Sequence, residues 1–132
     1  LDNDPAYPFG FGLSYTTFKY SQPMVAKTDF GINEPVVVNV TVTNTGNMDG
    51  EEVVQLYLRD MVASVTRPVK ELKAFKKIMI KKGESKSISF TLTKQDFEIF
   101  DSNMHKVVEP GEFQIFVGGN SDTKNKISIM IY

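Results

Sequence analysis

The chain has 132 residues, a formal net charge of −1 and an apolar fraction of 41%, which is the balance of one ordinary globular domain. It contains no cysteine, no tryptophan and a single histidine, which excludes disulfide frameworks, cysteine nucleophiles and cysteine-ligated zinc sites. No apolar run reaches the roughly 18 residues that a membrane-spanning helix requires, so we expect no membrane span.

The first residues, 1–13, show no regular alternation and are predicted to form an extended lead-in. After them, apolar and polar residues alternate with a period of two, the pattern of strands with one buried face. Segment 35–43 is the clearest case, because it places Val36, Val38, Val40 and Val42 on one face. Further strands are predicted over 18–26 (broken by Pro23), 53–59, 72–80, 87–93, 113–117 and 127–131.

Turn-forming residues separate these strands. Residues 44–50, 82–84, 109–112 and 118–122 are rich in Gly, Asn, Asp and Pro. No helical period extends over a dozen residues, and residues 94–100 can form one short helical turn at most. About seven strands joined by turns favour an all-β sandwich of two antiparallel sheets, and a small closed barrel is the alternative.

Carboxylates cluster at Glu51–Glu52 and at Asp96, Glu98 and Asp101. Glycosidases need two carboxyl groups facing one cleft, but adjacent strand residues such as Glu51 and Glu52 point to opposite faces. We therefore predict a solvated surface for all of them and no catalytic residue in this chain. His105 lies between two predicted strands, and no second histidine can share a metal with it. A Ser–His–Asp arrangement is the catalytic alternative, but no serine lies in a nucleophile-elbow pattern, so we predict an exposed loop histidine.

Two further patterns resemble ligand sites. Asn44, Asn47 and Asp49 offer oxygens to calcium but lack EF-hand spacing, so we interpret them as hairpin turn residues. Phe9-Gly10-Phe11-Gly12 contains a G-x-G, but it neither follows a strand nor opens a helix. We predict neither a metal site nor a cofactor. Asn39-Val40-Thr41 matches the N-glycosylation sequence on the outer face of a strand.

Basic residues concentrate in the centre of the chain, at Arg67, Lys70, Lys73, Lys76, Lys77, Lys81, Lys82, Lys86 and Lys94. Nucleic-acid modules combine such a block with a strongly basic domain and exposed aromatic residues. Here the whole domain is slightly acidic and Phe75 is assigned to the core, so no nucleic-acid partner is predicted. We favour the interpretation that these lysines lie on an edge strand and prevent its pairing with other chains. Docking of the basic block onto an acidic partner surface is the second interpretation.

Several apolar residues fall on predicted outer faces: Val37, Val53, Tyr57, Phe116, Met130 and Tyr132. If they cluster, they form an apolar patch that needs a cover, which indicates docking on another protein surface. Carbohydrate binding would also use exposed planar aromatic residues. Tryptophan is absent, so the tyrosines would have to take its place: Tyr7, Tyr15, Tyr20, Tyr57 and Tyr132.

A run of motifs in fixed order resembles a known family. Residues 7–18, Tyr7-Pro8-Phe9-Gly10-Phe11-Gly12-Leu13-Ser14-Tyr15-Thr16-Thr17-Phe18, resemble the junction between the catalytic part and the C-terminal fibronectin type III-like domain of glycoside hydrolase family 3 enzymes. Segments 40–46, 50–57, 67–75, 82–85, 109–113 and 117–118 resemble that domain itself. The resemblance covers Tyr7 to the C-terminus.

The resemblance implies an immunoglobulin/fibronectin type III-like antiparallel β-sandwich of about seven strands. Residues 1–16 would be a junction from a catalytic part outside this sequence, and residues 17–132 the sandwich. Family members are retaining β-glycosidases, many of them β-glucosidases or β-xylosidases. Their aspartate nucleophile lies in an N-terminal barrel and their acid/base in the next domain, and neither motif is present here. The family also implies a periplasmic or extracellular location in bacteria.

The implied role is that of a non-catalytic accessory domain that stabilises the catalytic domains by docking. Phe9, Phe11 and Leu13 are too apolar for a free tail, so the junction is expected to lie along those domains. The anchors would be Tyr7, Phe9, Phe11 and Tyr15, with Gly10 and Gly12 allowing close backbone approach. The alternatives are a carbohydrate-binding module that tethers substrate and a stand-alone protein-interaction domain.

Overall fold

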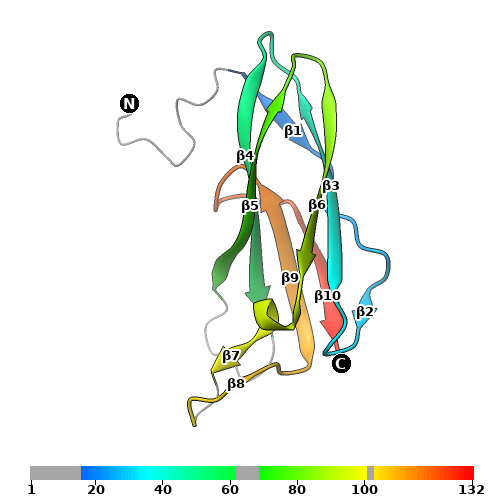
Figure 1. The fold of residues 1–132 in the computed structure, drawn as a ribbon, viewed down its shortest axis with the longest axis vertical. Coiled ribbons are helices and arrows are strands. Elements are labelled where there is room, and N and C mark those ends of the chain that lie inside the picture. Colours follow the sequence, from blue (N-terminus) through cyan, green and yellow to red (C-terminus); the bar gives the residue numbers. More distant parts are fainter. Residues whose placement is uncertain (1–15, 62–68, 101–102) are drawn as a thin grey trace.

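The computed structural model describes residues 16–61, 69–100 and 103–132, and nearly all of its regular elements are strands (Figure 1). In chain order they are β1 (Phe18–Tyr20), β2 (Asp29–Phe30), β3 (Val36–Asn44), β4 (Gly50–Asp60), β5 (Lys70–Ile80), β6 (Ser85–Leu92), the 3-10 turn η1 (Lys94–Phe97), β7 (Ile99–Phe100), β8 (Lys106–Val107), β9 (Gly111–Gly118) and β10 (Lys126–Ile131).

The strands form two large sheets and one small one. One sheet has the order β1-β3-β6, the second has the order β2-β10-β9-β4-β5, and β7 pairs with β8. Figure 1 shows the two large sheets as layers along the long axis of the molecule. No ladder of backbone hydrogen bonds joins these layers among the described strands. The predicted sandwich is therefore confirmed, in preference to the closed barrel.

A strand is present in each of the seven predicted segments, although the one predicted over 18–26 is limited to β1 (Phe18–Tyr20). The structure also has β2, β7 and β8, which the sequence did not predict. Each of these three has two residues, which is too short to show an alternation. One pairing also departs from the antiparallel prediction, because β2 runs parallel to β10. The chain leaves β1 in one sheet and crosses to the edge of the other before it returns as β3, and this crossing sets the direction of β2.

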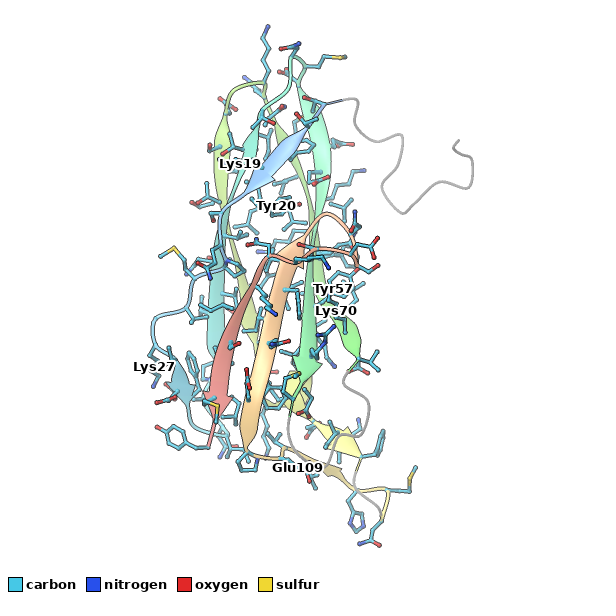
Figure 2. The ribbon with its side chains drawn as sticks, turned by 180° about the vertical axis from the view of Figure 1, so that it is seen from behind. Lys19, Tyr20, Lys27, Tyr57, Lys70 and Glu109 are labelled. Atoms are coloured by element: carbon cyan, nitrogen blue, oxygen red, sulfur yellow. The ribbon has the colours of Figure 1, made fainter. Side chains whose placement is uncertain are left out.

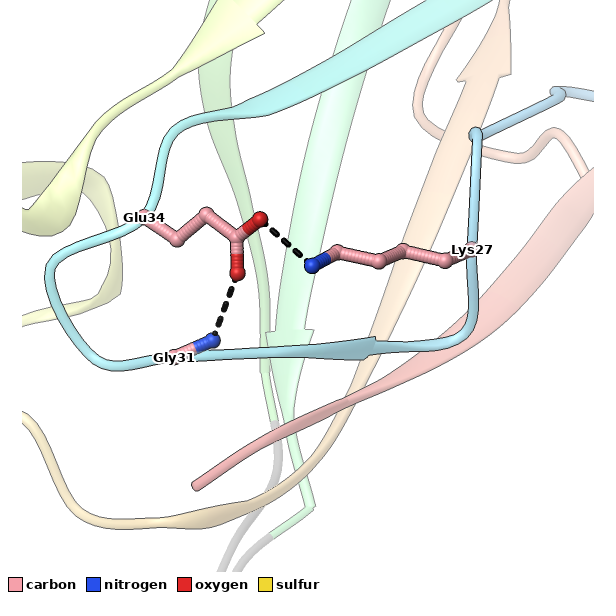
Figure 3. Close-up of polar contacts among 3 residues, drawn as sticks. All are labelled: Lys27, Gly31 and Glu34. Atoms are coloured by element: carbon pink, nitrogen blue, oxygen red, sulfur yellow. Dashed lines mark hydrogen bonds and ion pairs between the residues drawn. The ribbon is translucent and has the colours of Figure 1, made fainter.

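A polar clamp holds the β2 loop (Figure 3). The Glu34 carboxylate accepts a hydrogen bond of 2.9 Å from the Gly31 amide and pairs with the Lys27 ammonium at 2.5 Å. The shared contact lowers the pKa of Glu34 and raises the pKa of Lys27. The clamp closes the loop, and β2 reaches β10 through the Met130 amide, which donates to the Thr28 carbonyl.

The core lies between the two large sheets and follows the predicted alternation. The inward faces of β3 and β6 supply Val36, Val38, Val40, Val42, Ile88, Phe90 and Leu92, and the opposite sheet supplies Val54, Leu56, Leu58, Phe113, Ile115, Val117, Ile129 and Ile131. Phe97 of η1 closes one end by packing edge-on against Phe113, with ring centroids 5.0 Å apart. Burial of these apolar faces is the main stabilising term of the fold.

The turn after β3 is organised by Asn44, which is fully buried. Its amide nitrogen donates to the Met48 and Ile80 carbonyls at 2.8 and 2.9 Å. Its side-chain oxygen accepts from the Thr16 hydroxyl and the Gly46 amide at 2.8 and 3.0 Å. The interpretation of this segment as turn chemistry is therefore confirmed.

Candidate functional site

The residues predicted to dock on other domains lie outside the described residues. They are Tyr7, Phe9, Gly10, Phe11, Gly12 and Tyr15. Their role stays a prediction. Within the described residues, the two outer faces of the sandwich differ in chemistry.

The outer face of the β1-β3-β6 sheet is largely polar, although Val37 is exposed on it, as predicted. Along it, Val37, Asn39, Thr41 and Thr43 of β3 lie opposite Thr91, Ser89, Ser87 and Ser85 of β6. The Thr43 and Ser85 hydroxyls share a hydrogen bond of 2.6 Å, and the Asn39 side chain accepts one from Ser89. Such a row of hydroxyl groups is well solvated and needs no cover.

The outer face of the five-stranded sheet carries aromatic and apolar side chains. Val53, Tyr57 and Phe116 point outward as predicted, but they are only 5%, 9% and 3% exposed. These three therefore add almost no exposed apolar surface to such a patch, and three cationic side chains lie over the Phe116 ring. Met130 and Tyr132 are exposed, as predicted.

Strand β5 places an apolar row on this face, which we define as Leu72, Phe75 and Met79. These side chains are 49%, 59% and 48% exposed. The assignment of Phe75 to the core is therefore wrong. The register between β4 and β5 shifts at Leu56/Tyr57, so that Leu72 lies opposite Tyr57 and Phe75 opposite Gln55. This bulge puts residues three apart on one face, a spacing that hides the row from a period-two reading.

Three cations converge on the ring of Phe116, and we call them the cation cluster. The Lys70 ammonium lies 4.2 Å from the ring centroid, the Arg59 guanidinium 5.2 Å and the Lys126 ammonium 5.8 Å. Lys70 also donates to the Ser121 and Thr123 carbonyls at 3.0 and 2.7 Å. Figure 2 shows Lys70 beside Tyr57 on this side of the molecule.

The environment of Lys70 is electrostatically unfavourable for its charge. Partial burial is the main cause that lowers the pKa of Lys70. The positive charges of Arg59, Lys124 and Lys126 lower it further, and the negative charge of Asp122 opposes the change. Among the described residues, no member of the cation cluster forms an ion pair with a carboxylate. The cluster therefore concentrates three positive charges, which Asp122 offsets from a distance without forming an ion pair.

A buried hydrogen-bond chain ties the loop after β9 to the same face. The Tyr57 hydroxyl donates to the side-chain oxygen of Gln55, and the Gln55 amide donates to the Gly119 carbonyl at 3.0 Å. Burial raises the pKa of Tyr57, so its hydroxyl stays protonated and available as a donor.

Glu52 is half-buried and does not lie on a solvated surface, which corrects its prediction. The Tyr20 hydroxyl donates to its carboxylate at 2.8 Å and so joins β1 to β4 across the two sheets. Burial raises the pKa of Glu52, and it also raises the pKa of Tyr20. Glu51 points to the other side, 3.6 Å from the Lys77 ammonium.

The remaining candidate carboxylates have structural surroundings. Asp96 accepts a hydrogen bond of 2.8 Å from the Thr93 amide and caps η1. Asp96 and Glu98, both partly buried, line a cleft of about 180 Å³ with Leu58 and Phe97, so they are less solvated than predicted. Asp101 lies outside the described residues.

His105 is exposed between β7 and β8, as predicted. The described residues contain no group of three or more His, Cys, Asp or Glu side chains that could hold a metal ion. They also contain no helix long and apolar enough to cross a bilayer.

Four of the nine residues of the central basic block lie on an edge strand, and Arg67 lies outside the described residues. Strand β5 is the last strand of its sheet and carries Lys70, Lys73, Lys76 and Lys77, which confirms the edge-strand interpretation. Lys76 turns inward across the open edge and donates to the Ser89 carbonyl of β6 at 2.6 Å. Charged side chains along such an edge oppose pairing with another chain.

Comparison with known proteins identifies the family of this chain. The profile of the fibronectin type III-like domain matches residues 52–121. A β-xylosidase of Formosa agariphila is 52% identical over 120 residues, covering 91% of this chain and 17% of the relative. A periplasmic β-glucosidase of Salmonella typhimurium is 44% identical over 119 residues, covering 90% of this chain and 16% of the relative.

A solved structure agrees in fold as well as in sequence. The GH3 β-glucosidase of Bifidobacterium adolescentis superposes with a TM-score of 0.81 at 39% identity, over 98% of this chain and 19% of that chain. The chain thus spans less than a fifth of the length of these relatives. It belongs to the fibronectin type III-like domain family and is homologous to that region of β-glucosidases and β-xylosidases.

Proposed function

We propose that this chain is a non-catalytic accessory domain of a β-glucosidase or β-xylosidase, and that it stabilises the catalytic domains by docking on them. The observation that carries the proposal is that the relatives contain this domain as 16–17% of a longer glycosidase chain. Partly covered aromatic side chains and an exposed apolar row on one outer face support a docking role.

The proposal is tested by removing residues 17–132 from the complete enzyme. We expect a lower midpoint of thermal unfolding for the catalytic part, because the docked domain adds buried apolar area. The Michaelis constants for a glucoside and a xyloside should change by a similar factor, since no substrate contact is lost. An unchanged unfolding midpoint would contradict docking.

The carbohydrate-binding alternative makes a different prediction. A calorimetric titration of this chain with gluco- and xylo-oligosaccharides would then show binding, and the Tyr132→Ala variant would not bind. Tyr132 is the tyrosine to choose because it is 68% exposed. We expect no heat of binding.

We also propose that the parent enzyme acts in the periplasm or outside the cell. The periplasmic relative supports this location. The complete lack of cysteine fits a domain whose stability does not depend on the redox state of the compartment. Fractionation of the source cells with an antibody against this domain tests the location.

A further inference from the structure

The two outer faces cannot both be equally suited to an interface. The face of the three-stranded sheet carries hydroxyl groups that pair with one another, as Thr43 does with Ser85. The face of the five-stranded sheet combines aromatic, methionine and arginine side chains, the types that are enriched in protein–protein interfaces. An interface on the second face removes more apolar surface from water.

The apolar row and the cation cluster form one continuous surface. Leu72 lies opposite Tyr57, Tyr57 lies opposite Phe116 and Phe116 lies opposite Lys126, so a single line crosses four strands. One step along the strands, Lys70 lies opposite Arg59. An occupant of the row therefore meets the charges as well.

Two polar atoms of this face are already shielded from water without a partner. The Arg59 Nε and the Gln114 Oε1 are buried and make no hydrogen bond within the described part of the chain. Arg59 and Gln114 lie opposite each other in the β4–β9 ladder. Buried polar groups are normally paired, and this donor and this acceptor can pair with each other after a small side-chain movement, which contact with an occupant of the face can bring about.

The charge of the surface restricts its occupant. Lys70, Arg59 and Lys126 all lie within 6 Å of one ring centroid and repel one another. The two carbonyls that bind the Lys70 ammonium hold it in place before any partner arrives. A carboxylate that approaches the cluster is therefore attracted to Lys70 without a further loss of conformational entropy by the Lys70 side chain.

We propose that the outer face of the five-stranded sheet, from the apolar row to the cation cluster, is the docking face, and that its occupant is an acidic, partly apolar surface of the catalytic part of the same enzyme. The assignment rests on the proposed accessory function. It is supported by charge complementarity and by the length of the relatives, of which this chain covers only 16–17%.

Thiol labelling of the complete enzyme tests the face. Met79→Cys places a thiol in the apolar row, and Met24→Cys places the matched thiol beside β3, where Met24 pairs with Asn39. Both methionines are exposed, 48% and 64%, and this chain has no cysteine of its own. The labelling rate of each is measured in the complete enzyme and in the 132-residue chain.

We expect the thiol of the Met79→Cys variant to react at least tenfold more slowly in the complete enzyme than in the 132-residue chain. The thiol of the Met24→Cys variant should react at the same rate in both. Protection at position 24 in place of position 79 would overturn the assigned face and leave docking intact. Equal rates everywhere would overturn docking itself, and with it this inference. Concentration-dependent protection at position 79 in the 132-residue chain would instead identify a second copy as the occupant.

A charge variant tests the acidity of the occupant. In the Met79→Cys background, Lys126→Glu should raise the labelling rate of the complete enzyme several-fold, and the effect should shrink as salt increases. Lys19→Glu, on the outer face of the three-stranded sheet, is the matched control and should leave the rate unchanged. Equal effects of the two variants, or none, would overturn an acidic occupant.

Discussion

Single side chains connect the two sheets at a few points, and the contact between Tyr20 and Glu52 is one that responds to pH. Burial raises the pKa of Glu52 more than the Tyr20 hydroxyl and the Val53 amide lower it. The folded chain therefore holds a proton on Glu52 more readily than the unfolded chain does. The stability from this group is fully present below the unfolded pKa and is lost as pH rises through the folded pKa.

We expect Glu52→Gln to raise the free energy of unfolding at pH 7, because the amide is not charged and still offers an oxygen to Tyr20. The gain should shrink toward pH 4, where the native carboxyl group takes up its proton. Urea unfolding at both pH values measures the difference. Glu51→Gln, at the neighbouring position that faces Lys77, should change stability little at either pH. A loss of stability in Glu52→Gln at pH 7 would contradict the direction of the pKa shift.

Asn44 serves the turn after β3 through four hydrogen bonds from a fully buried position. Asn44→Ala leaves the Ile80 carbonyl without that donor, and we expect a cost of about 1–3 kcal/mol in unfolding free energy. The exposed Asn47 of the same turn is the control, and Asn47→Ala should stay within about 0.5 kcal/mol. Equal costs in chemical denaturation would show that burial of Asn44 is unimportant.

At the scale of the elements, β5 differs most from its sequence pattern. Its inward residues Ala74 and Ile78 pack against the core, whereas Phe75 faces outward. An apolar segment on a lysine-rich edge strand can be read with either face inward, and the bulge beside Leu56 makes the period ambiguous.

The difference between two phenylalanines tests this arrangement of the strands. Phe113→Ala, at a position 1% exposed between the sheets, should cost about 3–5 kcal/mol in unfolding free energy. Phe75→Ala, at a position 59% exposed, should cost about 0.5 kcal/mol in the 132-residue chain. Thermal or urea unfolding of the two variants measures both costs. A similar cost for both would place Phe75 in the core after all.

At the scale of the whole molecule, the predicted junction makes a claim about the complete enzyme. In the complete enzyme, Phe11→Ala should lower the midpoint of thermal unfolding and should have less effect on the choice between substrates, because the contact proposed for Phe11 is structural. A contact worth about 1 kcal/mol shifts the midpoint of a domain of 150–250 residues by about 2–4 °C. Met104→Ala is the control, since Met104 is 72% exposed. An unchanged midpoint in Phe11→Ala would count against docking by the junction.

The candidate site was only partly predictable from the sequence. Val53, Tyr57 and Phe116 could be assigned to an outer face, because alternation along a strand decides which side a residue takes. That Arg59, Lys70 and Lys126 meet on Phe116 could not be foreseen, since they come from three strands whose order in the sheet is not encoded locally.

The sequence by itself determined the class of fold, the seven longer strands, the inward face of β3 and the turn at Asn44, because each depends on neighbours in the chain. Tertiary structure alone decided the short strands, the parallel pairing of β2, the burial of Glu52 and the exposure of Phe75. These features arise from strand order, register and the contact of distant segments. Local patterns specify which face a side chain takes, and only the packed sheets specify what covers it.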